Sequence, residues 1–167
     1  MADGQVGFEI GPGVEQSPLP LPGAPPGDWA SFHREATARA TRAGLDPSSA
    51  EHVVSTYGAD VESLLELLVE DPGLRERILP GHPEIWAEVL HAVRGEMAMT
   101  VEDVLRRRLH LFYDAADGGV AVAAEVARRI AGEEGLGWSD QEAAEDAERY
   151  SRTVARARTA LAPRTPG

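Results

Sequence analysis

Residues 82–114 read HPEIWAEVLHAVRGEMAMTVEDVLRRRLHLFYD, and this run sets the organisation that we expect for the whole chain. Its first half has apolar residues at helical spacing, which predicts a helix buried on most sides. Pro83 suits the first helical position, because its missing N–H would have no intrahelical partner there. We expect Val93 and Met97 to be buried. The apolar positions are Ile85, Trp86, Val89, Leu90, Ala92, Val93 and Met97.

A second helix is predicted to begin at Thr100, after a tight turn. Asp103 stands three residues later, and the two residues resemble a capping box, in which the side chains satisfy backbone groups at a helix start. The inner face of this helix is predicted to hold Val101, Val104, Leu105, Leu109 and Phe112. The two helices together should form the centre of the domain.

Further helices are predicted on both sides of this central pair, from N-cap residues, glycines and apolar spacing. Ser139 and Glu142 form the clearest capping box of the chain. No segment alternates polar and apolar residues for long enough to build a sheet. The expected fold class is therefore all-α, with six or seven helices in an orthogonal or bundle-like domain. The flanking helices are expected at Asp28–Gly44, Asp46–Gly58, Asp60–Asp71, from Gly118 to the glycines around Leu136, and Ser139–Leu161.

The chain is predicted to hold one helical domain between two irregular ends. Residues 1–28 are rich in proline and glycine, which obstructs helix, so we expect a linker or disordered tail. The helical domain should cover residues 29–161, and residues 162–167 should be a frayed tail. Removing residues 1–27 is therefore expected to leave the helical content and the melting temperature nearly unchanged.

Composition excludes several classes of function. The formal net charge of -12 argues against sequence-independent binding of nucleic acid and against attachment to anionic lipid. No apolar run approaches the roughly 20 residues of a membrane span. The N-terminus has no signal-peptide pattern, so a cytoplasmic location is expected. Cysteine and lysine are both absent, which excludes disulfides, thiol catalysis, iron–sulfur clusters and Schiff-base chemistry in this chain.

The sequence does not support a metal site or a nucleotide site. Glu88 and His91 are three residues apart, as in di-iron helix bundles, but such a site needs a second Glu-x-x-His pair. The other histidines lack a glutamate three residues before them; they are His33, His52, His82 and His110. The glycines of residues 7–13 do not match the dinucleotide pattern Gly-x-Gly-x-x-Gly. We therefore expect no catalytic, cofactor-binding or metal-binding residue in this chain.

A family resemblance rests on short runs in and around the central pair. Through them, residues 49–150 resemble the C-terminal helical domain of FAD-dependent glycerol-3-phosphate dehydrogenases and oxidases. The runs are Ala87-Glu88-Val89, Ala92-Val93-Arg94, Glu96-Met97-Ala98, Thr100-Val101-Glu102-Asp103-Val104-Leu105 and Arg107-Arg108, with Tyr57-Gly58 upstream and Gly137-Trp138 downstream.

The resemblance implies an accessory domain of an enzyme that oxidises glycerol 3-phosphate to dihydroxyacetone phosphate. In that family the FAD and the reacting residues belong to the N-terminal part, so this chain should not be a complete oxidoreductase. Its expected partner is a flavin-bearing domain, in cis or in trans, and self-association is left open. Two surfaces are candidates for docking: Trp86 and Leu90 on the central helix, and the seam of the last helix through Tyr150 and Val154. We prefer the first, since tryptophan is favoured at contact centres.

Two alternatives stay open. The chain could be a free-standing helical interaction module, or, less in keeping with its residues, a metal-binding helical enzyme.

Charged residues on the central pair of helices also admit two interpretations. They could form an anion site for a substrate phosphate, or ion pairs that fix the packing of the helices. We prefer the ion pairs, because an unpaired buried charge costs several kcal/mol. These residues are Glu88, Arg94, Glu96, Arg107 and Arg108.

Overall fold

The computed structural model describes residues 23–25, 27–133 and 136–161, and these residues form seven α-helices. Between them lie the short 3-10 turns η1 (Gly58–Asp60), η2 (Pro72–Arg75) and η4 (Val120–Val122), and the π-helix η3 (Asp103–Arg108). The predicted all-α class is confirmed. The helices are α1 (Trp29–Arg42), α2 (Pro47–Tyr57), α3 (Val61–Glu70), α4 (Trp86–Glu96), α5 (Leu111–Asp114), α6 (Ala123–Ala131) and α7 (Asp140–Leu161).

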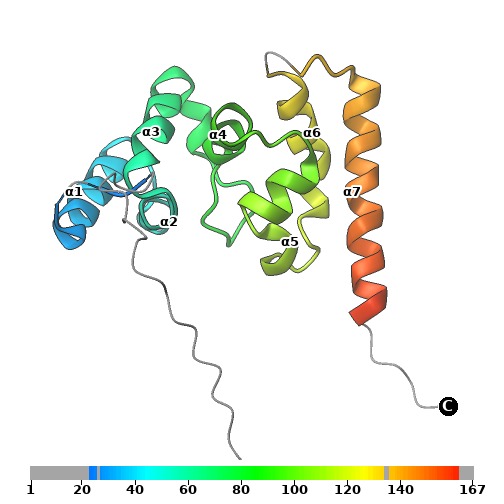
Figure 1. Cartoon of the computed structure of the whole chain (residues 1–167), viewed down its shortest axis with the longest axis horizontal. Helices are drawn as coiled ribbons and strands as arrows, with labels where there is room; N and C mark the ends of the chain where they lie inside the picture. Colours follow the sequence, from blue (N-terminus) through cyan, green and yellow to red (C-terminus); the bar gives the residue numbers. More distant parts are fainter. Residues whose placement is uncertain (1–22, 26, 134–135, 162–167) are drawn as a thin grey trace, which may run out of the picture.

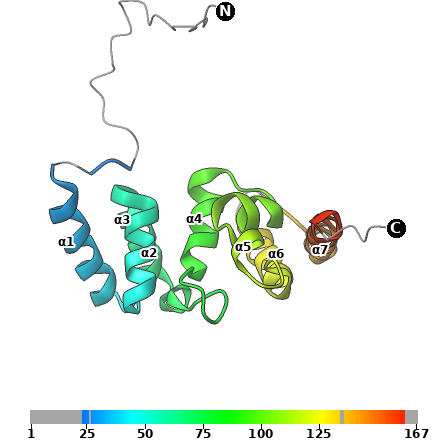
Figure 2. The ribbon, with the colours of Figure 1, turned by 90° about the horizontal axis from the view of Figure 1, so that it is seen from below.

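The helices follow one another along the long axis of the molecule, with α1 at one end and α7 at the other (Figures 1 and 2). The buried apolar side chains form one core that runs through this row, with α4 near its middle. Within the described ranges, no helix has both the length and the hydrophobicity needed to cross a membrane.

The first two helices begin where their capping residues predict. The Asp28 carboxylate accepts a hydrogen bond from the Ser31 N–H at 2.8 Å, and Asp46 accepts one from the Ser48 N–H at 3.0 Å. Each bond satisfies a donor that the first helical turn leaves without an intrahelical partner. The predicted starts of α1 and α2 are thus confirmed.

The N-terminal boundary of the helical domain involves Gly23. The Ala59 N–H donates to the Gly23 carbonyl oxygen at 2.9 Å. At Gly58 the backbone has a φ of +56°, and a Cβ there would stand 2.3 Å from the same oxygen, so this contact requires glycine. Contact with the helical part therefore begins before residue 29, and removing residues 1–27 would also remove this hydrogen bond.

The predicted start of the central helix at Pro83 is wrong. Helix α4 begins at Trp86, because the preceding backbone pairs with an earlier segment instead of winding into a helix. Ile78 donates its N–H to the Glu84 carbonyl at 2.9 Å, and Trp86 donates to the Glu76 carbonyl at 3.1 Å. This pairing contains an isolated antiparallel bridge between Arg77 and Ile85.

The prediction that Met97 is buried is also wrong. Ile85, Val89 and Ala92 are fully buried, and Val93 is half-buried, but the Met97 side chain is 85% exposed. The helix ends at Glu96, and Met97 adopts a left-handed conformation with a φ of +57° that turns its side chain away from the core. Ala98 is buried instead, and its N–H donates to the Ala92 carbonyl at 2.9 Å.

Trp86 and Leu90 do not form the exposed docking surface that was expected. Their side chains are only 8% and 9% exposed and belong to the core. The guanidinium of Arg129 covers the Trp86 ring, with 4.3 Å between the guanidinium carbon and the ring centroid. Neighbouring helices therefore already occupy the side of α4 that was assigned to a partner.

The capping pair at the second central helix is confirmed. The Asp103 N–H donates to the Thr100 hydroxyl oxygen at 3.1 Å, and the Asp103 carboxylate accepts from the Met99 N–H at 3.2 Å. The chain then forms π-helix η3 and breaks at His110, whose φ is +58°. The predicted inner face is buried at Val101, Val104, Leu105 and Leu109, whereas Phe112 is half-buried.

Helices α6 and α7 pack along each other at the end of the row (Figure 1). The Ser139–Glu142 capping box is confirmed, since the Ser139 N–H donates to the Glu142 carboxylate at 2.7 Å and the Glu142 N–H donates to the Ser139 hydroxyl at 3.3 Å. The predicted seam of α7 faces the core at Ala143, Ala147, Tyr150 and Val154. Ala157 is half-buried, and the Leu161 side chain lies outside the described set.

Candidate functional site

The segment Glu96–His110 combines several unusual features of the backbone. Its two ends carry Met97 and His110, which are the only non-glycine residues with positive φ in the described ranges. Between them lies the π-helix η3, a form that is rare and often found at functional positions. Residues held in sparsely populated conformations cluster at functional sites. We therefore treat residues 96–110, called the central segment below, as the candidate functional site.

Ion pairs join residues within the central segment. Arg108 lies 3.5 Å from the Glu96 carboxylate and donates to the Glu96 backbone carbonyl at 2.7 Å, which ties the end of η3 to the end of α4. Arg107 pairs with Asp103, one helical turn away. The charges on this part of the molecule thus have opposite neighbours within the chain.

Arg94 on α4 pairs with carboxylates from two other parts of the chain. Its guanidinium bonds to the Glu133 carboxylate at 2.6 Å and to the Glu70 carboxylate at 3.3 Å. All five charged residues that were singled out in the sequence have an oppositely charged or histidine neighbour, but only Glu96 and Arg108 pair with each other. This arrangement favours the interpretation as packing ion pairs over an anion site.

The last helix also reaches the central segment. Asp146 on α7 is 3% exposed, and its carboxylate accepts a hydrogen bond from the Val101 N–H at 2.7 Å. It therefore caps the start of the second central helix from a distant part of the chain. A polar cavity of about 220 Å³ lies beside this contact and is lined by Thr100, Glu102, Asp103, Arg107, Asp146, Arg149 and Tyr150.

A buried polar cluster supports α4 from the side of α2. Glu88 is fully buried, its Oε1 lies 2.9 Å from the Nε2 of His52, and its Oε2 accepts from the Ile85 N–H at 2.7 Å. Glu84 is 4% exposed, and its Oε2 has no hydrogen-bond partner. Ser49 donates its hydroxyl to the Pro83 carbonyl at 2.6 Å. The cluster fixes how α4 sits on α2.

Sequence reasoning missed His52 and Glu84 as members of this cluster. A carboxylate on an otherwise apolar helix indicates that Glu88 needs a partner. His52 stands 36 positions earlier, however, and helical spacing contains no information about which distant residue is that partner.

The cluster shifts the pKa values of its members. Burial alone would lower the pKa of His52, but the hydrogen bond and charge of Glu88, together with the charge of Glu84, raise it above its usual value. Burial raises the pKa of the Glu84 carboxyl. Burial also raises the pKa of the Tyr57 hydroxyl, and the negative charges of Glu88 and Glu96 add to that shift.

The free energy of unfolding is expected to fall as the pH rises above about 6.5, the ordinary pKa of histidine. A histidine whose folded-state pKa is raised contributes stability that is complete below its unfolded pKa and is lost as the pH passes the folded pKa. His52 is that group, and the raised pKa of Glu84 acts with the same sign at lower pH. Urea unfolding at a series of pH values measures the slope, which is at most about 1.4 kcal/mol per pH unit for one proton.

His52→Gln should flatten this pH dependence. The exposed His110 provides a matched control, because His110→Gln removes an imidazole from outside the cluster and should keep the slope. If the free energy of unfolding of His52→Gln depends on pH as steeply as that of the wild type, another titratable group causes the pH dependence.

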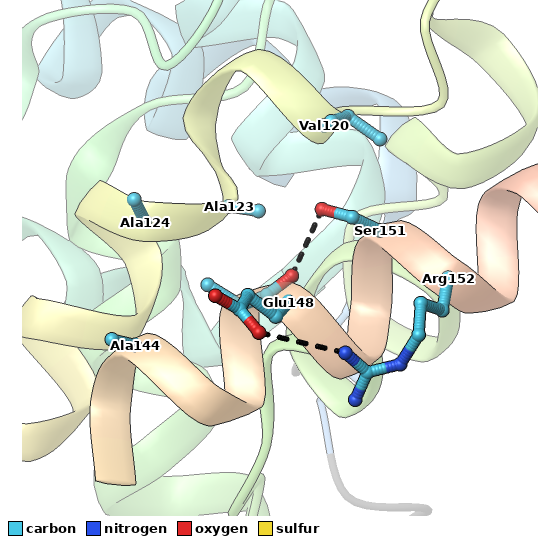
Figure 3. A pocket seen from close by; sticks show the side chains of 8 residues that line it. Val120, Ala123, Ala124, Ala144, Glu148, Ser151 and Arg152 are labelled. Carbon is cyan, nitrogen blue, oxygen red and sulfur yellow. Dashed lines mark hydrogen bonds and ion pairs between the residues drawn. The ribbon is translucent and has the colours of Figure 1, made fainter. Parts of the chain in front are cut away.

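A shallow trough of about 560 Å³ lies between α6 and α7 (Figure 3). Its polar side chains are satisfied on α7 itself, since Glu148 lies 3.5 Å from Arg152 and the Ser151 hydroxyl donates to the Ala147 carbonyl at 2.9 Å. The trough offers an apolar surface rather than a set of reactive groups. It is lined by Val120, Ala123, Ala124, Ala144, Ala147, Glu148, Ser151 and Arg152.

The Glu88–His91 pair is not arranged around a shared metal position. Glu88 bonds to His52, while the His91 ring packs edge-on against Tyr57 with 5.1 Å between the ring centroids. Across the described residues, no three histidine or carboxylate side chains gather in a way that could hold a metal ion. The same residues contain no strand, so they do not form the strand-turn-helix unit that holds the phosphates of a dinucleotide such as FAD.

Comparison with known proteins places this architecture in a family. Residues 15–143 match the family described as the C-terminal domain of alpha-glycerophosphate oxidase, a range that includes the central segment and the buried polar cluster. No solved structure matches the chain.

The curated relatives are longer proteins. A glycerol-3-phosphate dehydrogenase of Synechocystis is 32% identical over 106 residues, which is 64% of this chain and 19% of the relative. One of Mycobacterium leprae is 32% identical over 111 residues, or 66% of this chain and 19% of the relative. A probable mitochondrial glycerol-3-phosphate dehydrogenase of Dictyostelium discoideum is 36% identical over 69 residues, which is 41% of this chain and 11% of the relative. The chain thus spans about a fifth or less of the length of these relatives, and it belongs to the family of C-terminal domains of alpha-glycerophosphate oxidase.

Proposed function

We propose that this chain acts as the accessory C-terminal domain of an FAD-dependent glycerol-3-phosphate dehydrogenase. The reaction oxidises glycerol 3-phosphate to dihydroxyacetone phosphate, and FAD and the reacting groups lie in a partner domain, in cis or in trans. The observation that carries this proposal is the family match over residues 15–143, together with relatives named as glycerol-3-phosphate dehydrogenases. The chain itself contributes a helical body that packs against that partner.

The internal contacts suit a supporting role better than a reacting one. Glu88 is engaged by His52 and the Ile85 N–H, and Arg94 is engaged by Glu133 and Glu70. Charged groups that are already paired stabilise packing and are poorly placed to bind a charged substrate. The proposal includes a cytoplasmic location and no nucleic-acid partner, and the net charge of -12 supports the second point.

A free-standing interaction module is the second candidate function. The observation in its favour is the apolar trough between α6 and α7, the two helices at one end of the row in Figure 1. Such a module would bind a partner unrelated to glycerol 3-phosphate. The binding experiment described next distinguishes the two candidate functions.

The chain should bind a glycerol-3-phosphate dehydrogenase that lacks its own matching domain. We expect the Synechocystis relative, shortened by the 19% of its length that aligns with this chain, to form a complex in analytical ultracentrifugation. Glycerol 3-phosphate oxidation by the shortened enzyme should rise when the chain is added. The intact relative is the control, because its own domain already fills the position. No complex and no gain in activity with the shortened enzyme would contradict the proposed function.

A further inference from the structure

We propose that Met97 and Met99, together called the methionine edge, form the surface through which this domain packs against the flavin-bearing partner. The inference rests on the proposed function and adds the place of contact to it. It replaces Trp86 and Leu90, which the core already covers. Four independent observations support the methionine edge.

The first observation is exposure. Met97 is 85% exposed and Met99 is 56% exposed, so two of the five large exposed hydrophobic side chains of the described residues lie two positions apart. Methionine is enriched in protein interfaces, and its flexible side chain adapts to the shape of a partner. The core does not use either side chain, whereas the alanine between them, Ala98, is buried.

The second observation is that the backbone holds both side chains in this position. Met97 has a φ of +57°, which a non-glycine residue adopts only at a cost in free energy. Hydrogen bonds fix the two residues that follow Met97: the Ala98 N–H donates to the Ala92 carbonyl at 2.9 Å, and the Met99 N–H donates to the Asp103 carboxylate at 3.2 Å. A surface fixed before binding loses little conformational entropy when a partner arrives.

The third observation is the charge around the methionine edge. Arg108 pairs with Glu96, Arg107 pairs with Asp103, and Arg94 pairs with Glu133. The rim is therefore locally balanced on a chain whose net charge is -12. Paired charges close in sequence to an exposed apolar surface suit a protein–protein interface, in which an apolar centre lies inside a polar rim.

The fourth observation selects the occupant. The family match covers residues 15–143, which include the methionine edge, and the aligned part is only 19% of the Synechocystis relative. The remaining part of such a protein must contact this domain somewhere, and inter-domain contacts typically bury several hundred Å² of surface. An exposed apolar surface on a fixed backbone inside the matched range suits that contact.

Cysteine labelling tests the position directly, because the chain contains no cysteine. In Met97→Cys the single thiol should react readily with iodoacetamide in the free chain. A saturating amount of the shortened Synechocystis enzyme should slow that reaction at least tenfold. Trp29→Cys is the control: Trp29 is 47% exposed on α1, at the end of the molecule far from the centre of the row, and its labelling rate should change less than twofold.

Substitution with a charge tests the energetic importance of the same surface. Met97→Glu should weaken binding of the shortened enzyme at least tenfold, while Trp29→Glu should weaken it less than twofold. If the wild-type chain binds but both readouts at Met97 are unchanged, the methionine edge is wrong and the proposed function stands. If the wild-type chain does not bind the shortened enzyme at all, the proposed function is contradicted, and the methionine edge is overturned with it. Protection of Met97→Cys in the free chain that grows with its own concentration would assign the surface to a second copy and overturn the inference.

Discussion

Glu88→Ala is expected to destabilise the domain by about 3 to 5 kcal/mol, the largest effect of any single change considered for this chain. The substitution leaves the half-buried His52 without its counter-charge and the Ile85 N–H without its acceptor, because Glu88 supplies both contacts. It also opens a cavity, since the glutamate side chain is fully buried. Urea unfolding near pH 6, where His52 is protonated, measures the change.

Glu88→Gln separates the charge from the shape. The amide keeps the volume of the side chain and can still accept from the Ile85 N–H, so this variant should cost less, about 1 to 3 kcal/mol. A double-mutant cycle with His52→Gln isolates the contribution of the pair itself. Equal stability of the wild type and Glu88→Ala would show that the cluster does not hold α4 on α2.

Leu105→Ala is expected to cost about 2 to 5 kcal/mol, through lost burial and the cavity that remains. Leu105 lies in the π-helix, is fully buried and belongs to the hydrophobic core. Thermal unfolding followed by circular dichroism gives the loss. Met97→Ala serves as the matched comparison: its side chain is 85% exposed, so the same kind of truncation should change stability by less than about 0.5 kcal/mol. A larger loss of stability in Met97→Ala than in Leu105→Ala would show that Met97 belongs to the core, as the sequence predicted.

The parts of the fold that depend on neighbouring residues could be predicted from the sequence. Asp28, Asp46 and the Ser139–Glu142 pair each act on backbone groups within three positions, so their effect is visible in a short window. The apolar spacing of α7 likewise predicted its buried face as far as Val154.

The parts that depend on distant residues could not be predicted in this way. Pro83 precedes an apolar helical pattern, yet residues 76–78 pair with the backbone that follows it and delay the helix. Met97 continues the apolar spacing of α4, but the chain turns left-handed there and Ala98 takes the buried position. The same limit hid the candidate site, because the left-handed turn that exposes Met97 has no signature in the apolar spacing, and no glycine marks it.

The cap that Asp146 provides has a consequence for the order in which the chain becomes stable during synthesis. Val101 and Asp146 are 45 positions apart in the sequence. The Tyr150 hydroxyl donates to the carbonyl of Gly118, which stands 32 positions earlier. A ribosome therefore synthesises the whole central segment before it has made the residues that complete it. Until α7 emerges, the N–H of Val101 depends on water, and the apolar faces of α5 and α6 stay partly uncovered, which is a condition that favours chaperone binding over early folding.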